Sequence, residues 1–219
     1  MTSTVELEAA DLAALLCSRV CHDLINPVGA IGNGLEVLSD PTQTEMADFA
    51  RELIENSTKQ ARAKLEYARL AFGASSTAGT DIDTREAERV AKLLIAGEKA
   101  DLDWQIPPLI IPKNKVKLLL NMLLIVIGGV PRGGQITVEI GGEPGTENFS
   151  ITATGPKTLV PSGIPGLLAA TPEDGNVDAR GIQPYYTGLL ARLCHMGLNI
   201  GVENEELRFT ADPLPHDID

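Results

Sequence analysis

The chain has 219 residues, of which 43% are hydrophobic, and its 18 basic and 30 acidic side chains give a formal net charge of −12. The hydrophobic content excludes wholesale disorder, and the length allows one large domain or two small ones. The acidity argues against direct binding to nucleic acid or anionic lipid, because like charges repel each other.

The cysteines and the N-terminal segment bear on the compartment. Three cysteines cannot all pair with one another, and residues 1–8 carry acids where a secretory signal needs bases. The longest apolar stretch, residues 118–130, is too short to span a bilayer. We therefore expect no membrane insertion and a place in the reducing cytoplasm.

Residues 5–72 are predicted to form two long helices. Apolar side chains of the first helix alternate spacings of four and three, which is typical of a helix buried in a bundle. These seam residues are Ala10, Ala14, Cys17, Cys21, Leu24, Val28, Ile31, Leu35 and Leu38. Thr42 with Glu45 predicts a capping box for the second helix. The seam of that helix comprises Met46, Phe49, Leu53, Ala63, Tyr67 and Leu70.

A lone helical hairpin cannot enclose a core, and a second copy of the same hairpin would supply the missing helices. We therefore expect a homodimer built on a four-helix bundle. The alternative is that the hairpin packs only on its own C-terminal domain. Leu12, Leu15 and Leu16 lie off the seam, and they either dock a partner's helix or pack on that C-terminal domain.

The sequence changes character near Gly73, so we predict two domains, residues 1–74 and 75–219, joined by a small-residue linker at 74–80. The second domain is predicted to mix both types of secondary structure, with an extended segment at 104–111. Its expected helices are 83–100, 113–127 and 184–196, and its expected strands are 135–140, 148–154, 199–202 and 207–210. The predicted fold class is α+β, a helical hairpin followed by an α/β sandwich.

Residues 18–27 read Ser-Arg-Val-Cys-His-Asp-Leu-Ile-Asn-Pro. His22 follows Cys21 of the seam, which places its imidazole on the outer face of the bundle. Pro27 inside a helix costs about 3 kcal/mol or more, so its place one turn beyond His22 predicts a deliberate kink.

Residues 22–27 resemble the H-box of sensor histidine kinases, whose pattern is His, an acid, an aliphatic residue, any residue, Asn or Thr, and Pro. The longer run to residue 36 is similar to the bacterial histidine phosphotransferases in particular. The resemblance implies that His22 becomes phosphorylated and that two hairpins form a dimeric bundle. A neutral imidazole is a nucleophile near neutral pH and holds phosphate as a labile phosphoramidate.

The neighbours of His22 have expected roles in that chemistry. Asp23 accepts a proton or fixes the imidazole tautomer, and Asn26 donates to a phosphoryl oxygen or a water. Counting back from the turn at residue 40 puts residues 59–62 level with His22, where a cation offsets phosphate charge; the alternative is a solvated helix face. A metal site with Cys17 and Cys21 is disfavoured, because both lie in the apolar seam without a second ligand cluster.

The C-terminal half resembles the ATP-binding domain of histidine kinases with its nucleotide chemistry lost. Asn121 aligns with the start of the N-box, but the metal-binding asparagine four positions later is Ile125. Ala153 replaces the adenine-reading aspartate, Lys157 replaces a glycine, and Gly188 alone remains of the phosphate-loop glycines. We therefore expect no ATP binding and no cofactor of its own.

The resemblance implies a phosphorelay protein that takes phosphate from one receiver-domain aspartate and gives it to another. The implied partners are receiver domains of a CckA-like hybrid kinase and of CtrA-like and CpdR-like response regulators, with Mg²⁺ held in the acidic pocket of the receiver. Two alternatives stay open, a histidine autokinase with a divergent ATP site and a dimeric scaffold that is never phosphorylated.

Overall fold

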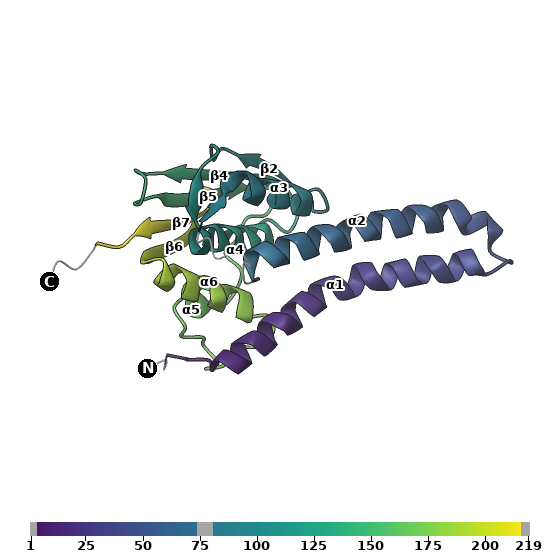
Figure 1. Ribbon diagram of the computed structural model, residues 1–219, viewed down its shortest axis with the longest axis horizontal. Helices are drawn as coiled ribbons and strands as arrows, with labels where there is room; N and C mark the ends of the chain where they lie inside the picture. The colour runs from purple at the N-terminus through teal and green to yellow at the C-terminus, as the bar shows by residue number, and fades with distance from the viewer. Residues whose placement is uncertain (1–3, 74–80, 216–219) are drawn as a thin grey trace.

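A computed structural model describes residues 4–73 and 81–215, so the predicted linker at 74–80 lies outside the described residues. Two long helices, α1 (Ala9–Ser39) and α2 (Ala47–Ala71), form an antiparallel hairpin that projects from the rest of the molecule (Figure 1). A short 3₁₀ helix, η1 (Thr44–Met46), lies between them.

The turn of the hairpin differs from the predicted capping box of Thr42 and Glu45. The Asp40 carboxylate accepts hydrogen bonds from the Thr42 amide at 2.9 Å and from the Thr42 hydroxyl at 2.7 Å. Aspartate favours such local turns because its short side chain reaches the backbone two residues on. Helix α2 therefore begins several residues later than the box predicts.

The C-terminal part is built on one mixed sheet in the order β2-β4-β5-β7-β6. Its strands are β2 (Ala100–Trp104), β4 (Gly134–Gly141), β5 (Asn148–Thr154), β6 (Met196–Glu203) and β7 (Glu206–Pro213). A separate antiparallel pair joins β1 (Asp81–Asp83) to β3 (Ile110–Pro112). The helices are α3 (Thr84–Ile95), α4 (Lys113–Gly129), α5 (Ile164–Leu168) and α6 (Ile182–Leu193). The predicted α+β class is confirmed.

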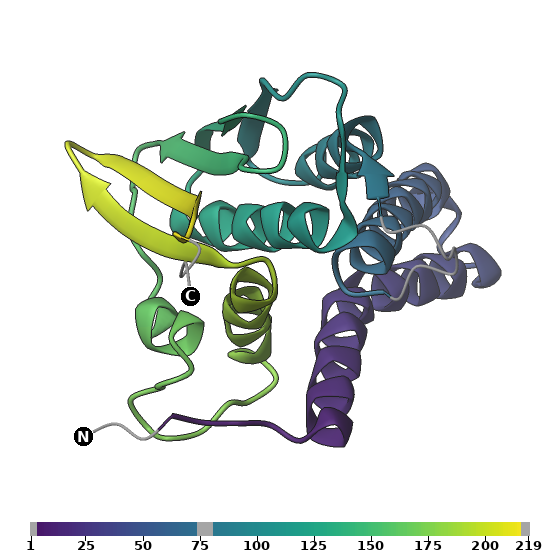
Figure 2. The same ribbon diagram turned by 60° about the vertical axis from the view of Figure 1, so that its left-hand side comes forward.

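One strand pair departs from the expected pattern. Strand β2 runs parallel to β4, whereas the other pairs of the sheet are antiparallel. The predicted helix 83–100 is too long, because α3 ends at Ile95 and Ala100 already begins β2. A parallel pair needs a crossover connection, and α4 supplies it beneath the sheet (Figure 2).

Helix α2 joins the core of the C-terminal part. Tyr67 and Ala71 are buried in the same cluster as the apolar side chains of α4 and the sheet. The Tyr67 hydroxyl donates to the Leu120 carbonyl at 2.6 Å, and burial raises the pKa of Tyr67 well above its ordinary value. The hairpin therefore continues into the C-terminal core through the last turns of α2.

Asn121 is buried at the centre of this junction. Its Nδ2 donates to the carbonyls of Ala71 at 3.1 Å and Lys117 at 2.9 Å, and its Oδ1 accepts from Gln183 Nε2 at 3.1 Å. One side chain thus links α2, α4 and α6. Where the sequence resemblance aligned it with a nucleotide-binding motif, the structure shows a bond between helices.

The Asn121→Ala variant is expected to lose about 2–3 kcal/mol of stability, because the Ala71 carbonyl loses this donor in a dry core. For a chain of this size that corresponds to a melting temperature lower by roughly 4–12 °C. Thermal unfolding followed by circular dichroism measures it. Asn199→Ala, on an exposed position of β6, is the matched control, and equal melting of both variants would contradict the assigned role.

The first turns of α1 also pack on the C-terminal part. Leu12, Leu15 and Leu16 contact the buried cluster of Ala170, Val177, Ile182 and Tyr185. The Val5 amide donates to the Ala170 carbonyl at 2.8 Å, and the Tyr185 hydroxyl donates to the Val5 carbonyl at 3.1 Å. Of the two roles predicted for these leucines, packing on the C-terminal domain is therefore the observed one.

The far half of the hairpin keeps an exposed apolar stripe. Its members come from both helices and the turn between them, and in the single chain they are Val28, Leu35, Leu38, Met46 and Phe49. The seam predicted from spacing thus divides into a part covered by the C-terminal domain and this uncovered stripe. None of the helices in the described ranges, 4–73 and 81–215, combines the length and hydropathy that crossing a membrane needs.

Candidate phosphotransfer site

His22 lies near the middle of α1, on its solvent-exposed surface. Its side chain is 70% exposed. Its Nδ1 atom is 3.5 Å from Oδ1 of Asp23, a long contact that leaves Nε2 on the opposite side of the ring. The predicted exposed position of this imidazole agrees with the structure, and the side chain is open to a large partner.

Asp23 is held from two directions. Its Oδ2 accepts a hydrogen bond from Nε of Arg19, one turn earlier, at 2.9 Å. Its backbone carbonyl accepts from Nζ of Lys64 on α2 at 3.3 Å. The carboxylate beside His22 is therefore fixed by Arg19 of α1, and the backbone of Asp23 is tied to the neighbouring helix.

Pro27 explains why Lys64 finds a free carbonyl. In an α-helix the amide of residue 27 donates to the carbonyl of residue 23, and proline has no amide hydrogen to donate. The Asp23 carbonyl is left without its helical donor, and Lys64 takes that place from α2. Helix α1 continues through Pro27 and bends along its length (Figure 1), as expected for an internal proline.

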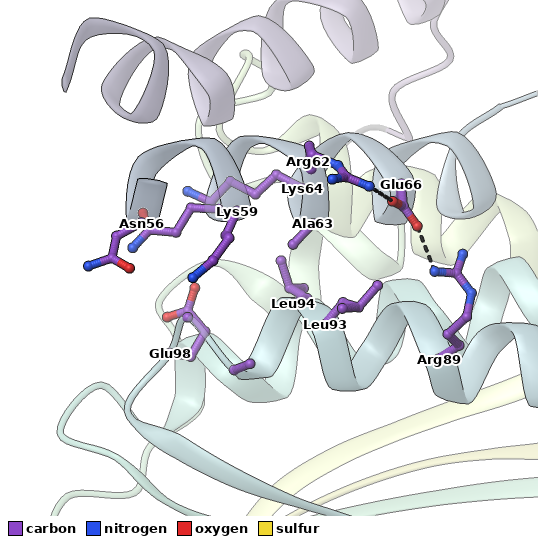
Figure 3. Close-up of a pocket in the computed structure, with 13 residues that line it drawn as sticks. Asn56, Lys59, Arg62, Ala63, Lys64, Glu66, Arg89, Leu93, Leu94 and Glu98 are labelled. Carbon is purple, nitrogen blue, oxygen red and sulfur yellow. Dashed lines mark hydrogen bonds and ion pairs between the residues drawn. The ribbon is translucent and has the colours of Figure 1, made fainter. Parts of the chain in front are cut away.

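The basic residues at 59–62 are not the ones beside His22. Figure 3 shows Lys59 and Arg62 on the side of α2 that faces α3, where they line a cavity of about 780 Å³. Arg62 and Arg89 both pair with Glu66, at 4.0 and 2.6 Å. Lys64, which lines the same cavity, is the cation that reaches α1.

The Lys64→Met variant keeps the aliphatic stem and removes the donor to Asp23. We expect it to cost about 0.5–1.5 kcal/mol, because one partly exposed hydrogen bond is lost, and to lower the melting temperature by about 1–6 °C. Lys59→Met on the same helix is the control, since Lys59 lines the same cavity but makes no hydrogen bond to α1 within the described part of the chain. If both variants have the same melting temperature, the hydrogen bond from Lys64 to the Asp23 carbonyl does not stabilise the hairpin, and this interpretation is wrong.

Asn26 is exposed and lies one helical turn beyond His22 on α1. Residues four apart share a face of a helix, so the predicted role of Asn26 at the phosphoryl group stays a prediction that its helical position allows. Cys17 and Cys21 are exposed free thiols in the single chain. Within residues 4–73 and 81–215, no three His, Cys, Asp or Glu side chains gather closely enough to hold a metal ion.

The region that resembles a nucleotide site has apolar walls and charged side chains of both signs, with Arg19 and Arg180 among its lining residues. Ile125 is buried on α4 and lines a cavity of about 520 Å³ together with Glu173, Asp174 and Asp178. Gly188 serves packing, because a Cβ atom there would collide with the Leu168 carbonyl oxygen. Ala153 is buried within β5.

Arg19 and Lys64 are the site residues that the sequence analysis missed. A signal for Arg19 was present, because Arg and Asp four positions apart pair on a helix surface. Lys64 carried no such signal, since its partner is a backbone carbonyl 41 positions away in the chain.

An exposed helical histidine beside a fixed carboxylate, on a hairpin joined to an α+β domain, is typical of proteins that carry a phosphoryl group on imidazole. The family model of the histidine phosphotransferase C-terminal domain matches residues 84–206. Protein phosphotransferase ChpT of Brucella abortus (strain 2308) is 44% identical over 212 residues, which cover 97% of this chain and 100% of that protein.

A solved structure described as a bacterial phosphotransferase agrees with this similarity. It matches with a TM-score of 0.89 and 44% identity, over 96% of this chain and 100% of that chain. The chain therefore belongs to the histidine phosphotransferase family, and its activity is phosphoryl transfer.

Proposed function

We propose that His22 is the phosphoacceptor of a relay and exchanges a phosphoryl group with receiver-domain aspartates. The observation that carries the proposal is the exposed imidazole whose Nδ1 faces Asp23. A proton kept on Nδ1 leaves the lone pair on Nε2 as the nucleophile, aimed at solvent and at an incoming partner.

Each transfer is one in-line displacement at phosphorus. The bond from His22 Nε2 to phosphorus forms while the bond from phosphorus to the receiver's aspartyl oxygen breaks, and the aspartate leaves as a carboxylate. Positive charge that develops on the imidazole is offset by the Asp23 carboxylate, which can also take the Nδ1 proton. Asn26 donates to a phosphoryl oxygen. The reverse displacement returns the phosphoryl group to a second receiver.

We further propose that the chain binds no ATP and supplies no cofactor. The proposal rests on Ile125, whose aliphatic side chain offers no oxygen to Mg²⁺ at the position of the metal-binding asparagine. In the proposed reaction Mg²⁺ belongs to the receiver's acidic pocket. The partners we propose are receivers of a CckA-like hybrid kinase and of CtrA-like and CpdR-like regulators.

The proposed assembly is a homodimer in the cytoplasm. The exposed stripe on the far half of the hairpin supports a four-helix bundle with a second copy, and the free thiols fit a reducing compartment. In this proposal residues 1–74 form the dimerisation and phosphotransfer domain. Residues 75–219 form the degenerate ATP-binding-like domain.

The test is to incubate the protein with labelled ATP, first alone and then with a receiver that carries labelled acyl phosphate. We expect label on the protein only with the receiver. Label from ATP alone would replace the proposal with a divergent autokinase. No label under either condition would replace it with an unphosphorylated scaffold.

A further inference from the structure

Arg19 is placed to control the carboxylate beside His22. Its Nε donates to Asp23 Oδ2 at 2.9 Å, and the other oxygen of that carboxylate is the one nearest the imidazole. The guanidinium of Arg is rigid and planar, so a hydrogen bond from Nε limits where the carboxylate oxygen that accepts it can lie. Arg19, Asp23 and His22 are therefore linked in a chain of contacts through the two oxygens of the Asp23 carboxylate.

The C-terminal domain confines Arg19. Only 28% of this side chain is exposed, although it lies on the surface helix that carries His22. Arg19 lines two cavities, of about 520 and 240 Å³, and Leu124 and Gly128 of α4 line both of them with it. Helix α4 therefore lies across these cavities from Arg19, and the two together enclose the space around its side chain.

Confinement matters because a lone surface ion pair is weak. An exposed pair of this spacing on a helix contributes only about 0.3–0.5 kcal/mol, and its long side chains sample many rotamers. Enclosing Arg19 between α1 and the C-terminal domain reduces the number of rotamers open to it before it binds the carboxylate. The Asp23 carbonyl is fixed separately by Lys64, so rotation of the carboxylate is the freedom that Arg19 restricts.

We propose that Arg19 is a positioning residue for phosphoryl transfer, and that the C-terminal domain acts on the reaction through it. Arg19 orients the Asp23 carboxylate toward Nδ1 of His22, and the C-terminal domain limits the space that is open to Arg19. This inference rests on the proposed function of His22. It gives a role to the C-terminal domain, whose resemblance to the kinase ATP-binding domain lacks the expected nucleotide-binding residues.

At metal sites, a group that hydrogen-bonds the other ring nitrogen of a histidine contributes about 10- to 100-fold to activity. We expect a similar loss of transfer rate when Arg19 is removed. Arg19→Met keeps the stem and removes the guanidinium. Its first-order rate of transfer from a phosphorylated receiver should fall about 10- to 100-fold, while the receiver concentration at half-saturation stays within about 2-fold. Arg19→Lys should recover part of the rate, because an ammonium restores the charge without the fork.

A second readout follows the imidazole directly, without any transfer. Long-range ¹H–¹⁵N NMR of the neutral ring, assigned with His22→Gln, reports which nitrogen carries the proton. The wild type should show mainly the Nδ1–H form, and Arg19→Met should shift the population toward Nε2–H. Leu124→Ala, which enlarges both cavities, should shift it in the same direction by less.

Arg62→Met is the matched control, since Arg62 is an exposed arginine on α2 that pairs with Glu66. It should change neither the tautomer nor the rate. An unchanged tautomer in Arg19→Met would overturn the proposal at any transfer rate. A raised half-saturation with an unchanged rate would also overturn it, because Arg19 would then contact the partner. If wild-type protein takes no label, the proposed function fails, while the NMR experiment still tests Arg19.

Discussion

The His22→Gln variant is expected to accept no measurable phosphate from a phosphorylated receiver. Removing the nucleophile of a group-transfer site typically lowers the rate by more than about 10³-fold, since other groups of the site cannot replace it. Because His22 is 70% exposed, its loss removes no core contact, and the melting temperature should stay within about 2 °C. Labelled receiver and gel autoradiography measure the first effect, and circular dichroism measures the second.

The matched control is His195→Asn, because His195 is an exposed histidine in the turn after α6. Its φ of 52° is in the left-handed region, and asparagine tolerates that region better than most residues. This variant should accept label as the wild type does. If His22→Gln still takes the label and His195→Asn does not, the phosphoacceptor is His195 and the assignment to His22 is wrong.

The exposed position of His22 could be predicted because it depends on helical spacing alone. An apolar seam with period 3.5 defines the buried face, and His22 follows the seam residue Cys21. The same reasoning identified the apolar stripe of both helices. It could not tell which face of α1 the C-terminal domain covers, because that depends on contacts between the off-seam Leu15 and segments near Tyr185, about 170 positions later in the chain.

The cation level with His22 was mispredicted for a geometrical reason. Counting from the Asp40 turn assumes that α2 begins at once, whereas residues 40–46 form the turn and η1. His22 lies 17 residues before the end of α1, and Lys64 lies 17 residues after the start of α2. Counting from the observed ends of both helices therefore places Lys64 level with His22. Helix ends are set by local capping, which the predicted Thr42–Glu45 box described wrongly.

The parallel strand β2 was missed for a similar reason. Residues 96–100 continue the polar character of α3, and the helix stops where Gly97 and the following turn interrupt it. The strand itself alternates exposed and covered positions over only five residues. Its parallel pairing with β4 depends on the α4 crossover between the two strands, and local sequence patterns do not predict such long-range pairing.

The proposed dimer gives the second large prediction. Leu35 and Phe49 are 52% and 60% exposed in the single chain, and they lie near the turn of the hairpin, far from the C-terminal domain. Large apolar side chains of this exposure on two neighbouring helices are typical of an interface that a partner covers. In a two-fold dimer each of them is buried twice, so a single substitution acts on both copies.

Replacing Leu35 or Phe49 with aspartate should therefore convert the dimer to monomers. Burying each side chain contributes about 1.5–3 kcal/mol, so the two copies together contribute about 3–6 kcal/mol to association. Loss of that amount raises the dimer dissociation constant by about 10²- to 10⁴-fold. Analytical ultracentrifugation measures the change, and the fold of each monomer should survive, because these residues lie outside the C-terminal core.

Ile110→Asp tests whether any new surface charge has this effect. Ile110 is an exposed apolar residue of β3 in the C-terminal part, away from the stripe, so this variant should sediment as the wild type does. A wild-type monomer at micromolar concentration would remove the dimer from the proposal. A dimer unaffected by Leu35→Asp and Phe49→Asp would place the interface elsewhere. In either case His22 would remain testable, because its exposure and its contact with Asp23 belong to the single chain.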